Sequence, residues 1–394
     1  MAQVYSREFT KKVDYPLIII LASLLIIGLL MVYSSSFDFA YRYLDQQSTY
    51  FFGRQIIWAL LGTAGMTVMM SIDYHTWRRF SIPLMGGILL LLIFLLIVGQ
   101  ERFGSVRALW GGSVQPSELC KLIIIIYVAD WLSSKGERIR MVTYGLVPFA
   151  ILIGVVASLI VMQPDFSTAI LIVVTAIAMF FIAGADILQL IIGFIFGGAT
   201  FGFLISRSEH ALARVKVYLG SLGGADVGYH VQQNLDALRA GGVSGTGLGN
   251  GAFKLGGALP LAHNDSIFAV LGEELGLIGS LLVVGLFVAL AYRGFQIALE
   301  ASDDFGTVLA AGLTCWLIFQ ALINLAVTTN TLPFTGIPLP FISYGGSSLA
   351  VSMAGVGLLL GISRGAVAER SDESARYDFG RRDGRPRISN SRRR

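Results

Sequence analysis

The tripeptide His263-Asn264-Asp265 brings an imidazole, an amide and a carboxylate together just before an apolar stretch, 267–292, that is long enough to cross a bilayer. A carboxylate there lies at a membrane face, and in a chain that is mostly membrane-spanning helix the few ionisable groups near that face are candidates for chemistry. This carboxylate can also cap the helix that follows, because Asp is a favoured N-cap and the helix dipole stabilises its charge. Both interpretations remain open on the sequence alone.

Two further acidic residues, Glu273 and Glu274, lie inside the same apolar stretch. At 1.5 Å per residue they are about 12 Å along the expected helix from Asp265. Charge within a membrane span is costly and usually functional. The two carboxylates therefore either contribute to a site near Asp265 or pair with a lysine or arginine of a neighbouring helix.

The segment Gln115-Pro116-Ser117-Glu118 predicts the start of a helix with proline in its first turn. Glu118 and Lys121 then share a helix face at spacing i, i+3. They form either an internal ion pair or part of a site in which Lys121 holds a phosphate. Asp165 offers the same choice, since it can cap the next helix or join that site.

Two other patterns argue against common ligand sites. The glycine run 245–251 lacks the final glycine of the dinucleotide spacing and the Lys-Ser/Thr of a P-loop, and no strand precedes it. We interpret it as backbone that turns tightly or approaches a partner closely. The four histidines show no metal-ligand spacing, so a structural zinc site is not expected.

The composition predicts an integral membrane protein, because 55% of the 394 residues are hydrophobic and only 14% are charged. An all-α membrane domain, 16–363, is expected, with about ten transmembrane helices. The expected spans are 16–34, 55–71, 80–99, 117–133, 144–163, 167–184, 186–205, 267–292, 305–328 and 344–363.

Basic residues predict the orientation. The segment 1–15 carries Arg7, Lys11 and Lys12 and lacks a small-residue cleavage site, so the first span is expected to be uncleaved, with a cytoplasmic N-terminus. Ten crossings return the C-terminus to the cytoplasm, where the tail 364–394 holds ten arginines and is expected to be disordered. A cytoplasmic leaflet accounts for this charge, and no nucleic-acid partner is expected.

Two connections are unusual. The large extracytoplasmic loop between spans 7 and 8, 206–266, has twelve glycines and two amphipathic pieces near 208–218 and 229–240, which predict helices lying on the bundle or the membrane interface. The segment 329–346 contains three prolines, so it predicts irregular backbone that dips into the protein. Such backbone is tolerated at membrane depth only when it is buried or lines a wet cavity.

Taken together, these motifs resemble the SEDS family, the FtsW/RodA/SpoVE group of polytopic bacterial membrane proteins. The resemblance covers nearly the whole chain to about Arg364, and Ser347-Ser348 with 233–238 is more similar to the division type than to the elongation type. Its markers are Gln115-Pro-Ser-Glu118 with Lys121, Gln163-Pro-Asp165, 241–251, Leu259-Pro260, His263-Asn-Asp265, Glu273-Glu274-Leu-Gly276, Gly336-Ile-Pro-Leu-Pro340 and Ser343-Tyr-Gly-Gly-Ser347.

The resemblance implies a peptidoglycan glycosyltransferase of the bacterial cytoplasmic membrane that polymerises lipid II at the outer face. Asp265 matches the essential aspartate and is expected to be the catalytic base. Implied partners are lipid II, membrane lipid and a class B penicillin-binding protein transpeptidase; a divalent cation, Mg²⁺ or Mn²⁺, is a candidate, and no organic cofactor is expected. The substrate-binding candidates are Arg107, Glu118, Lys121, Asp165, Arg214, Lys216, His263, Glu273, Glu274 and Ser343.

Two alternatives come from other functional classes. A lipid II flippase would also need a helical bundle with polar groups in its spans. A scaffold that recruits proteins through its basic tail would depend on that tail and not on Asp265. Polymerisation in detergent, where no second compartment exists, separates the enzyme from the flippase.

Overall fold

The computed structural model describes residues 13–43, 49–98, 115–223, 228–255, 259 and 262–382. Within these residues the regular structure is entirely helical, which confirms the all-α prediction. The helices are α1 (Tyr15–Tyr43), α2 (Tyr50–Ser71), α3 (Tyr74–Val98), α4 (Pro116–Ser133), the 3-10 helix η2 (Gly136–Arg140), α5 (Leu146–Val161), α6 (Phe166–Ile182), α7 (Ile187–Arg207), α8 (Glu209–Leu222), α9 (Tyr229–Gly241), α10 (Ile267–Glu300), α11 (Asp304–Thr328) and α12 (Gly346–Arg382).

Six of these helices are long and apolar enough to cross a membrane, namely α1, α3, α7, α10, α11 and the part of α12 up to Gly365. Helices α5 and α6 are apolar but shorter, and α4 carries three charged residues among its 18 residues. The membrane character of the chain is therefore clear.

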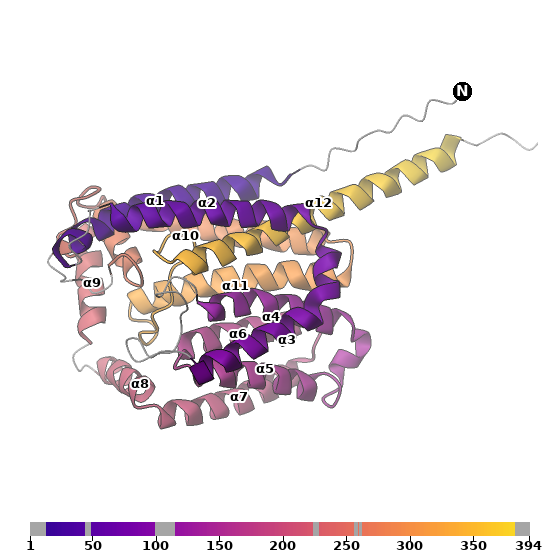
Figure 1. The fold of residues 1–394 in the computed structure, drawn as a ribbon, viewed down its shortest axis with the longest axis horizontal. Coiled ribbons are helices and arrows are strands. Elements are labelled where there is room, and N and C mark those ends of the chain that lie inside the picture. The colour runs from indigo at the N-terminus through magenta and orange to yellow at the C-terminus, as the bar shows by residue number, and fades with distance from the viewer. Residues whose placement is uncertain are drawn as a thin grey trace, which may run out of the picture.

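Helix α11 lies at the centre of the bundle, where it packs against α4, α6 and α10. Its Trp316 and Phe305 are among the largest fully buried side chains. Around this centre, α2 packs along α12 and α1 packs along α10 (Figure 1). The apolar faces of these helices are buried against each other, and this fixes where their few polar residues can meet.

Helices α8 and α9 lie at one end of the bundle, whereas the start of α1 and the far end of α12 lie at the other (Figure 1). Their positions match the two helices expected in the loop 206–266. Helix α8 follows α7 after one residue, Ser208, whose hydroxyl caps α8 by accepting a hydrogen bond from Ala211 N at 3.4 Å. This end of the molecule also carries the start of α10, and with it Asp265.

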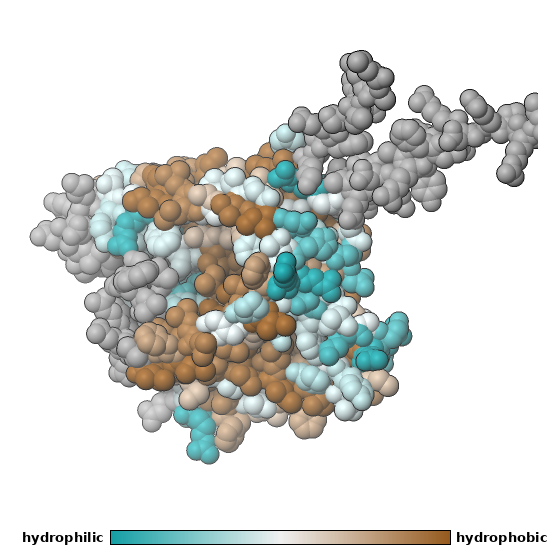
Figure 2. All heavy atoms as spheres, turned by 45° about the vertical axis from the view of Figure 1, so that its right-hand side comes forward, coloured by the Kyte–Doolittle hydropathy of each residue, from teal (hydrophilic) through white to brown (hydrophobic). Residues whose placement is uncertain are grey.

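Two ion pairs link helices at the opposite end. Arg293 of α10 pairs with Asp14, just before α1, at 2.9 Å, and Arg78 of α3 pairs with Asp130 of α4 at 3.1 Å. Figure 2 shows hydrophobic side chains over the flank of the bundle and a concentration of hydrophilic ones near the point where α12 leaves it. Charged side chains are therefore gathered where α12 leaves the bundle.

The C-terminal segment differs from its prediction. A disordered tail was expected from residue 364, but α12 continues to Arg382. Ala, Glu and Arg recur in this stretch and have high helix propensity, so the helix extends beyond the apolar part without needing a core. Residues 1–12 and 383–394 lie outside the described residues.

Helix α10 is broken at Gly276, whose φ of 68° and ψ of −165° are not helical. The glycine-rich segment 242–247 fills the break: Thr246 N and Gly247 N donate to the carbonyls of Glu273 and Glu274. Leu277 N and Ile278 N donate in turn to the carbonyls of residues 242 and 243. A Cβ on Gly245 would lie 2.2 Å from Glu274 O, so the close approach expected for this glycine run is confirmed.

Candidate functional site

A cavity of about 910 Å³ opens at the end of the bundle that carries Asp265. Its walls come from α2, α4, α6, α8, α9, the turn before α10, the proline-rich segment and the start of α12. Three acidic and three basic side chains border it: Glu118, Asp165, Asp265, Arg54, Lys121 and Arg214. Five of these six residues were site candidates on the sequence, and Arg54 was not.

Asp265 borders the cavity without capping α10. The helix begins at Ile267 with Ser266 at the N-cap position and no side-chain cap hydrogen bond, so the N-cap alternative for Asp265 is wrong. Gly336 lies beside the carboxylate, since a Cβ on it would sit 3.2 Å from Asp265 Oδ2. The φ of Gly336 is 75°, a conformation that favours glycine, so the proline-rich segment approaches the carboxylate with bare backbone.

The rest of the turn is held by the proline-rich segment. Ser343 Oγ donates to Asn264 O at 2.7 Å, and Tyr344 N donates to His263 O at 2.9 Å. The His263 ring is 6% exposed and lies against Phe51, with ring centroids 4.6 Å apart. Burial lowers the pKa of His263 to about 4, so the ring is neutral near pH 7. His263 and Ser343 do not border the cavity and shape the turn instead.

Glu118 and Lys121 form the ion pair that their spacing predicts, with Lys121 Nζ 2.7 Å from Glu118 Oε2. Lys121 is only 2% exposed, and its ammonium group also donates to Gln320 Oε1 at 3.1 Å. Both residues of the pair nevertheless border the cavity. The two interpretations offered by the sequence are therefore compatible, because one pair can be internal and still present charge to a ligand.

Asp165 likewise fits both alternatives from the sequence, since it caps a helix and also borders the cavity. Its carboxylate caps α6, accepting from Thr168 N at 3.2 Å and from Thr168 Oγ1 at 2.9 Å. The amide of Gln115 approaches the same carboxylate at 3.4 Å. Asp165 thus holds the start of α6 against the start of α4, where both helices border the cavity.

Helix α8 contributes Arg214 to the cavity wall, and helix α9 contributes His230. Phe334 of the proline-rich segment lies between them: its ring centroid is 4.9 Å from that of His230 and 5.7 Å from the guanidinium carbon of Arg214. Burial and the charge of Arg214 lower the pKa of His230. Lys216 does not border the cavity.

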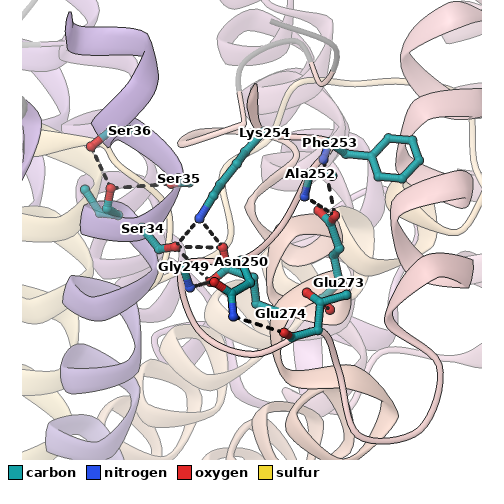
Figure 3. A network of polar contacts seen from close by, with 12 residues as sticks. Ser34, Ser35, Ser36, Gly249, Asn250, Ala252, Phe253, Lys254, Glu273 and Glu274 are labelled. Atoms are coloured by element: carbon teal, nitrogen blue, oxygen red, sulfur yellow. Dashed lines mark hydrogen bonds and ion pairs between the residues drawn. The ribbon is translucent and has the colours of Figure 1, made fainter. Parts of the chain in front are cut away.

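Glu273 and Glu274 lie away from the cavity, in what we call the glycine-loop cluster: Ser34, Lys254, both glutamates and the backbone amides of 249–253 (Figure 3). Lys254 Nζ lies 2.5 Å from Glu274 Oε1, and Ser34 Oγ donates to the same carboxylate at 2.7 Å. Ala252 N and Phe253 N donate to Glu273. Of the two sequence interpretations, pairing with a lysine matches the geometry of Glu274, although that lysine comes from the loop and not from a neighbouring helix; Glu273 accepts from backbone amides instead.

Two expectations have no structural outcome. Arg107 lies outside the described residues. Within the described part of the chain there is no group of three or more His, Cys, Asp or Glu side chains that could hold a metal ion. The divalent cation stays a prediction.

Comparison with known proteins identifies the family. The model for the FtsW, RodA and SpoVE cell cycle proteins matches residues 15–367. A Trichlorobacter lovleyi protein named "Probable peptidoglycan glycosyltransferase FtsW" is 38% identical over 376 residues, 93% of this chain and 97% of that protein. Stage V sporulation protein E of Bacillus subtilis is 41% identical over 369 residues, 90% and 98% of the two chains. The chain belongs to the FtsW/RodA/SpoVE family, as the motifs predicted.

Solved structures agree with this assignment. RodA from Thermus thermophilus matches with a TM-score of 0.66 and 26% identity, over 89% of this chain and 97% of RodA. A chain of a peptidoglycan synthase complex that coordinates polymerization and crosslinking matches with a TM-score of 0.73 and 26% identity, over 90% and 98% of the two chains.

Proposed function

We propose that this chain is a peptidoglycan glycosyltransferase that polymerises lipid II at the outer face of the cytoplasmic membrane, with Asp265 as general base. The observation that carries the proposal is the position of Asp265, whose carboxylate borders a 910 Å³ cavity together with Lys121, Arg54 and Arg214. Relatives of comparable length are named peptidoglycan glycosyltransferases.

The reaction needs few protein groups. A sugar hydroxyl of the acceptor attacks the anomeric carbon of the donor, the bond from that carbon to the lipid diphosphate breaks, and the configuration inverts. Asp265 accepts the proton of the attacking hydroxyl. The diphosphate departs with the bonding electron pair, so a single base is sufficient provided that the charge on the leaving group is countered.

Basic side chains on two sides of the cavity can supply that counter-charge. Lys121 approaches from α4 and Arg214 from α8, while Arg54 projects from the first turn of α2, where its guanidinium donates to Tyr50 Oη at 2.8 Å. Guanidinium groups match phosphate oxygens geometrically, and their attraction strengthens where water is excluded. We assign the diphosphate to this basic part of the wall.

The proposal includes a membrane topology. We place ten helices across the bilayer, α1 to α7 and α10 to α12, so that both termini lie in the cytoplasm and the cavity faces outward. The end near Arg78 and Arg293 then meets the cytoplasmic leaflet, in keeping with the positive-inside bias. The partner we propose is a class B penicillin-binding protein, because a related chain belongs to a synthase complex that polymerises and crosslinks peptidoglycan.

The test is to purify the protein with its transpeptidase partner in detergent and supply lipid II. Formation of glycan polymer supports the proposal, because detergent offers no second compartment between which a lipid could be moved. A preparation that transfers lipid II between leaflets of vesicles, yet forms no polymer in either setting, would favour a flippase.

A further inference from the structure

Two buried amides on one face of α11, Gln320 and Asn324, connect the elements that carry the charges of the cavity. They are spaced i, i+4 and are 0% and 2% exposed. Neither residue borders the cavity itself. They nevertheless bond to four residues that do, so their position behind the wall calls for a functional explanation.

Asn324 bridges the Asp265 turn and the proline-rich segment. Its Nδ2 donates to Asp265 O at 3.1 Å and to Ile337 O at 2.8 Å. A primary amide is the neutral group that offers two N–H donors on one atom, so it can hold two carbonyls of different segments at once. The backbone of Asp265 is therefore fixed relative to Gly336, which precedes Ile337 and approaches the carboxylate.

Gln320 makes the corresponding connection for Lys121. Its Nε2 donates to the carbonyl oxygen of Pro338, the residue after Ile337, at 3.0 Å. Its Oε1 accepts from Lys121 Nζ and from Trp316 Nε1, each at 3.1 Å. The ammonium group is thus anchored to the same proline-rich segment that Asn324 ties to Asp265.

We propose that Asn324 and Gln320 are positioning residues that hold Asp265 and Lys121 in one frame, with α11 as its rigid support. The inference rests on the proposed glycosyltransferase function. Asn324 sets where the base meets the attacking hydroxyl, and Gln320 sets where Lys121 meets the diphosphate. The two amides therefore affect different kinetic constants, which a purely structural role would not predict.

The experiment measures lipid II polymerisation by the purified complex for Asn324→Leu, Gln320→Leu and Thr314→Val. Thr314 is the control: it lies on α11, is 1% exposed, and its hydroxyl donates to Ala310 O within its own helix. For Asn324→Leu we expect kcat to fall by about tenfold or more with KM within about twofold, because the base is displaced while binding contacts remain. For Gln320→Leu we expect the larger change in KM, a rise of roughly fivefold, because Lys121 loses an anchor. Thr314→Val should leave both constants within about twofold of the unmodified complex.

Asn324→Ser provides a second variant should Asn324→Leu fail to fold, since serine keeps a donor for only one carbonyl and should give an intermediate kcat. Equal changes in kcat and KM for both amide variants, or losses no larger than for Thr314→Val, would overturn the inference while the unmodified complex still makes polymer. Absence of polymer from the unmodified complex would instead overturn the proposed function, and the inference with it.

Discussion

The cavity and the glycine-loop cluster both contain carboxylates, a lysine and small residues, and both lie at the same end of the molecule. They differ in whether their charged side chains border open volume. In the cluster, Lys254 pairs with Glu274, and the backbone N–H groups of Gly249, Ala252 and Phe253 donate to the two glutamates. In the cavity, Asp265, Lys121 and Arg54 border an open volume of about 910 Å³. Charge that only protein groups contact stabilises the fold, whereas charge that also borders open volume can contact a ligand as well.

The largest expected effect on stability comes from a substitution at Gly276, where α10 is broken and the glycine-rich segment packs. In Gly276→Ala, the new Cβ would lie 2.3 Å from Gly245 N and 2.5 Å from Val243 O, at a φ of 68° that alanine rarely adopts. The segment 242–247 would have to leave the break, so we expect unfolding to become easier by more than about 4 kcal/mol, measured by thermal unfolding in detergent.

The matched control is Gly285→Ala, on the same helix and with open space around its Cβ position. It should be neutral or stabilising by roughly 0.5–1 kcal/mol, because alanine favours helix over glycine. Similar unfolding midpoints for the two variants would contradict the role assigned to the glycine run.

Substituting one lysine in the cluster and one at the cavity compares what each contributes to stability and to polymerisation. Lys254→Met leaves Glu274 buried at 1% exposure without its cation, and we expect a loss of about 3–5 kcal/mol in unfolding free energy. Adding Glu274→Gln should restore part of that stability. Lys121→Met likewise leaves a buried carboxylate, Glu118 at 4% exposure, without its cation, so stability should fall here too; polymerisation should fall in addition, because Lys121 borders the cavity. The comparison fails if Lys254→Met unfolds like the unmodified protein.

Acid should affect the Asp265 turn through His263. Its folded-state pKa of about 4 lies below the ordinary value of 6.5 because the ring is buried, so between these values the unfolded chain binds a proton that the folded chain does not. Stability should therefore fall as the pH drops from about 6.5 to about 4, by up to roughly 3 kcal/mol. Unfolding midpoints across this range check the expectation, and His263→Phe should reduce the slope. An equal slope in both proteins would assign the acid sensitivity to other groups.

Asp165 should show the smallest change in stability. Asparagine keeps one acceptor oxygen for the cap at Thr168 N but places an NH2 group where Oδ2 accepts from Thr168 Oγ1, so Asp165→Asn should lower the unfolding free energy by about 1–2 kcal/mol. The lost charge borders the cavity, so polymerisation should slow. An unchanged polymerisation rate would show that Asp165 serves only to cap α6.

The sequence predicted the helices well because hydropathy and helix starts are local properties. Pro116 marks the start of α4, and the expected cap at Asp165 is present. The break at Gly276 could not be predicted, because the sequence does not distinguish Gly276 from Gly272 and Gly279, which stay helical, and only the tertiary contact with 242–247 makes it a break.

The site was predictable only in part. Spacing gives the distance of Glu273 from Asp265 along a helix, but it does not say which face of that helix meets the cavity. Gln320 and Asn324 were missed although their i, i+4 spacing forms a polar stripe in an apolar stretch, a signal that could have identified them. Arg54 carries no comparable pattern, since basic residues at helix starts are common.

The central claim is that the carboxylate of Asp265 takes the proton of the attacking hydroxyl. The most direct measurement is the rate of lipid II polymerisation by the purified complex carrying Asp265→Asn, at saturating substrate and with thermal unfolding recorded in parallel. We predict a rate lowered by about 10²–10⁴-fold, typical of a lost general base, with lipid II still bound and the unfolding midpoint unchanged. A folded Asp265→Asn complex that makes glycan strands at the rate of the unmodified complex would contradict the account.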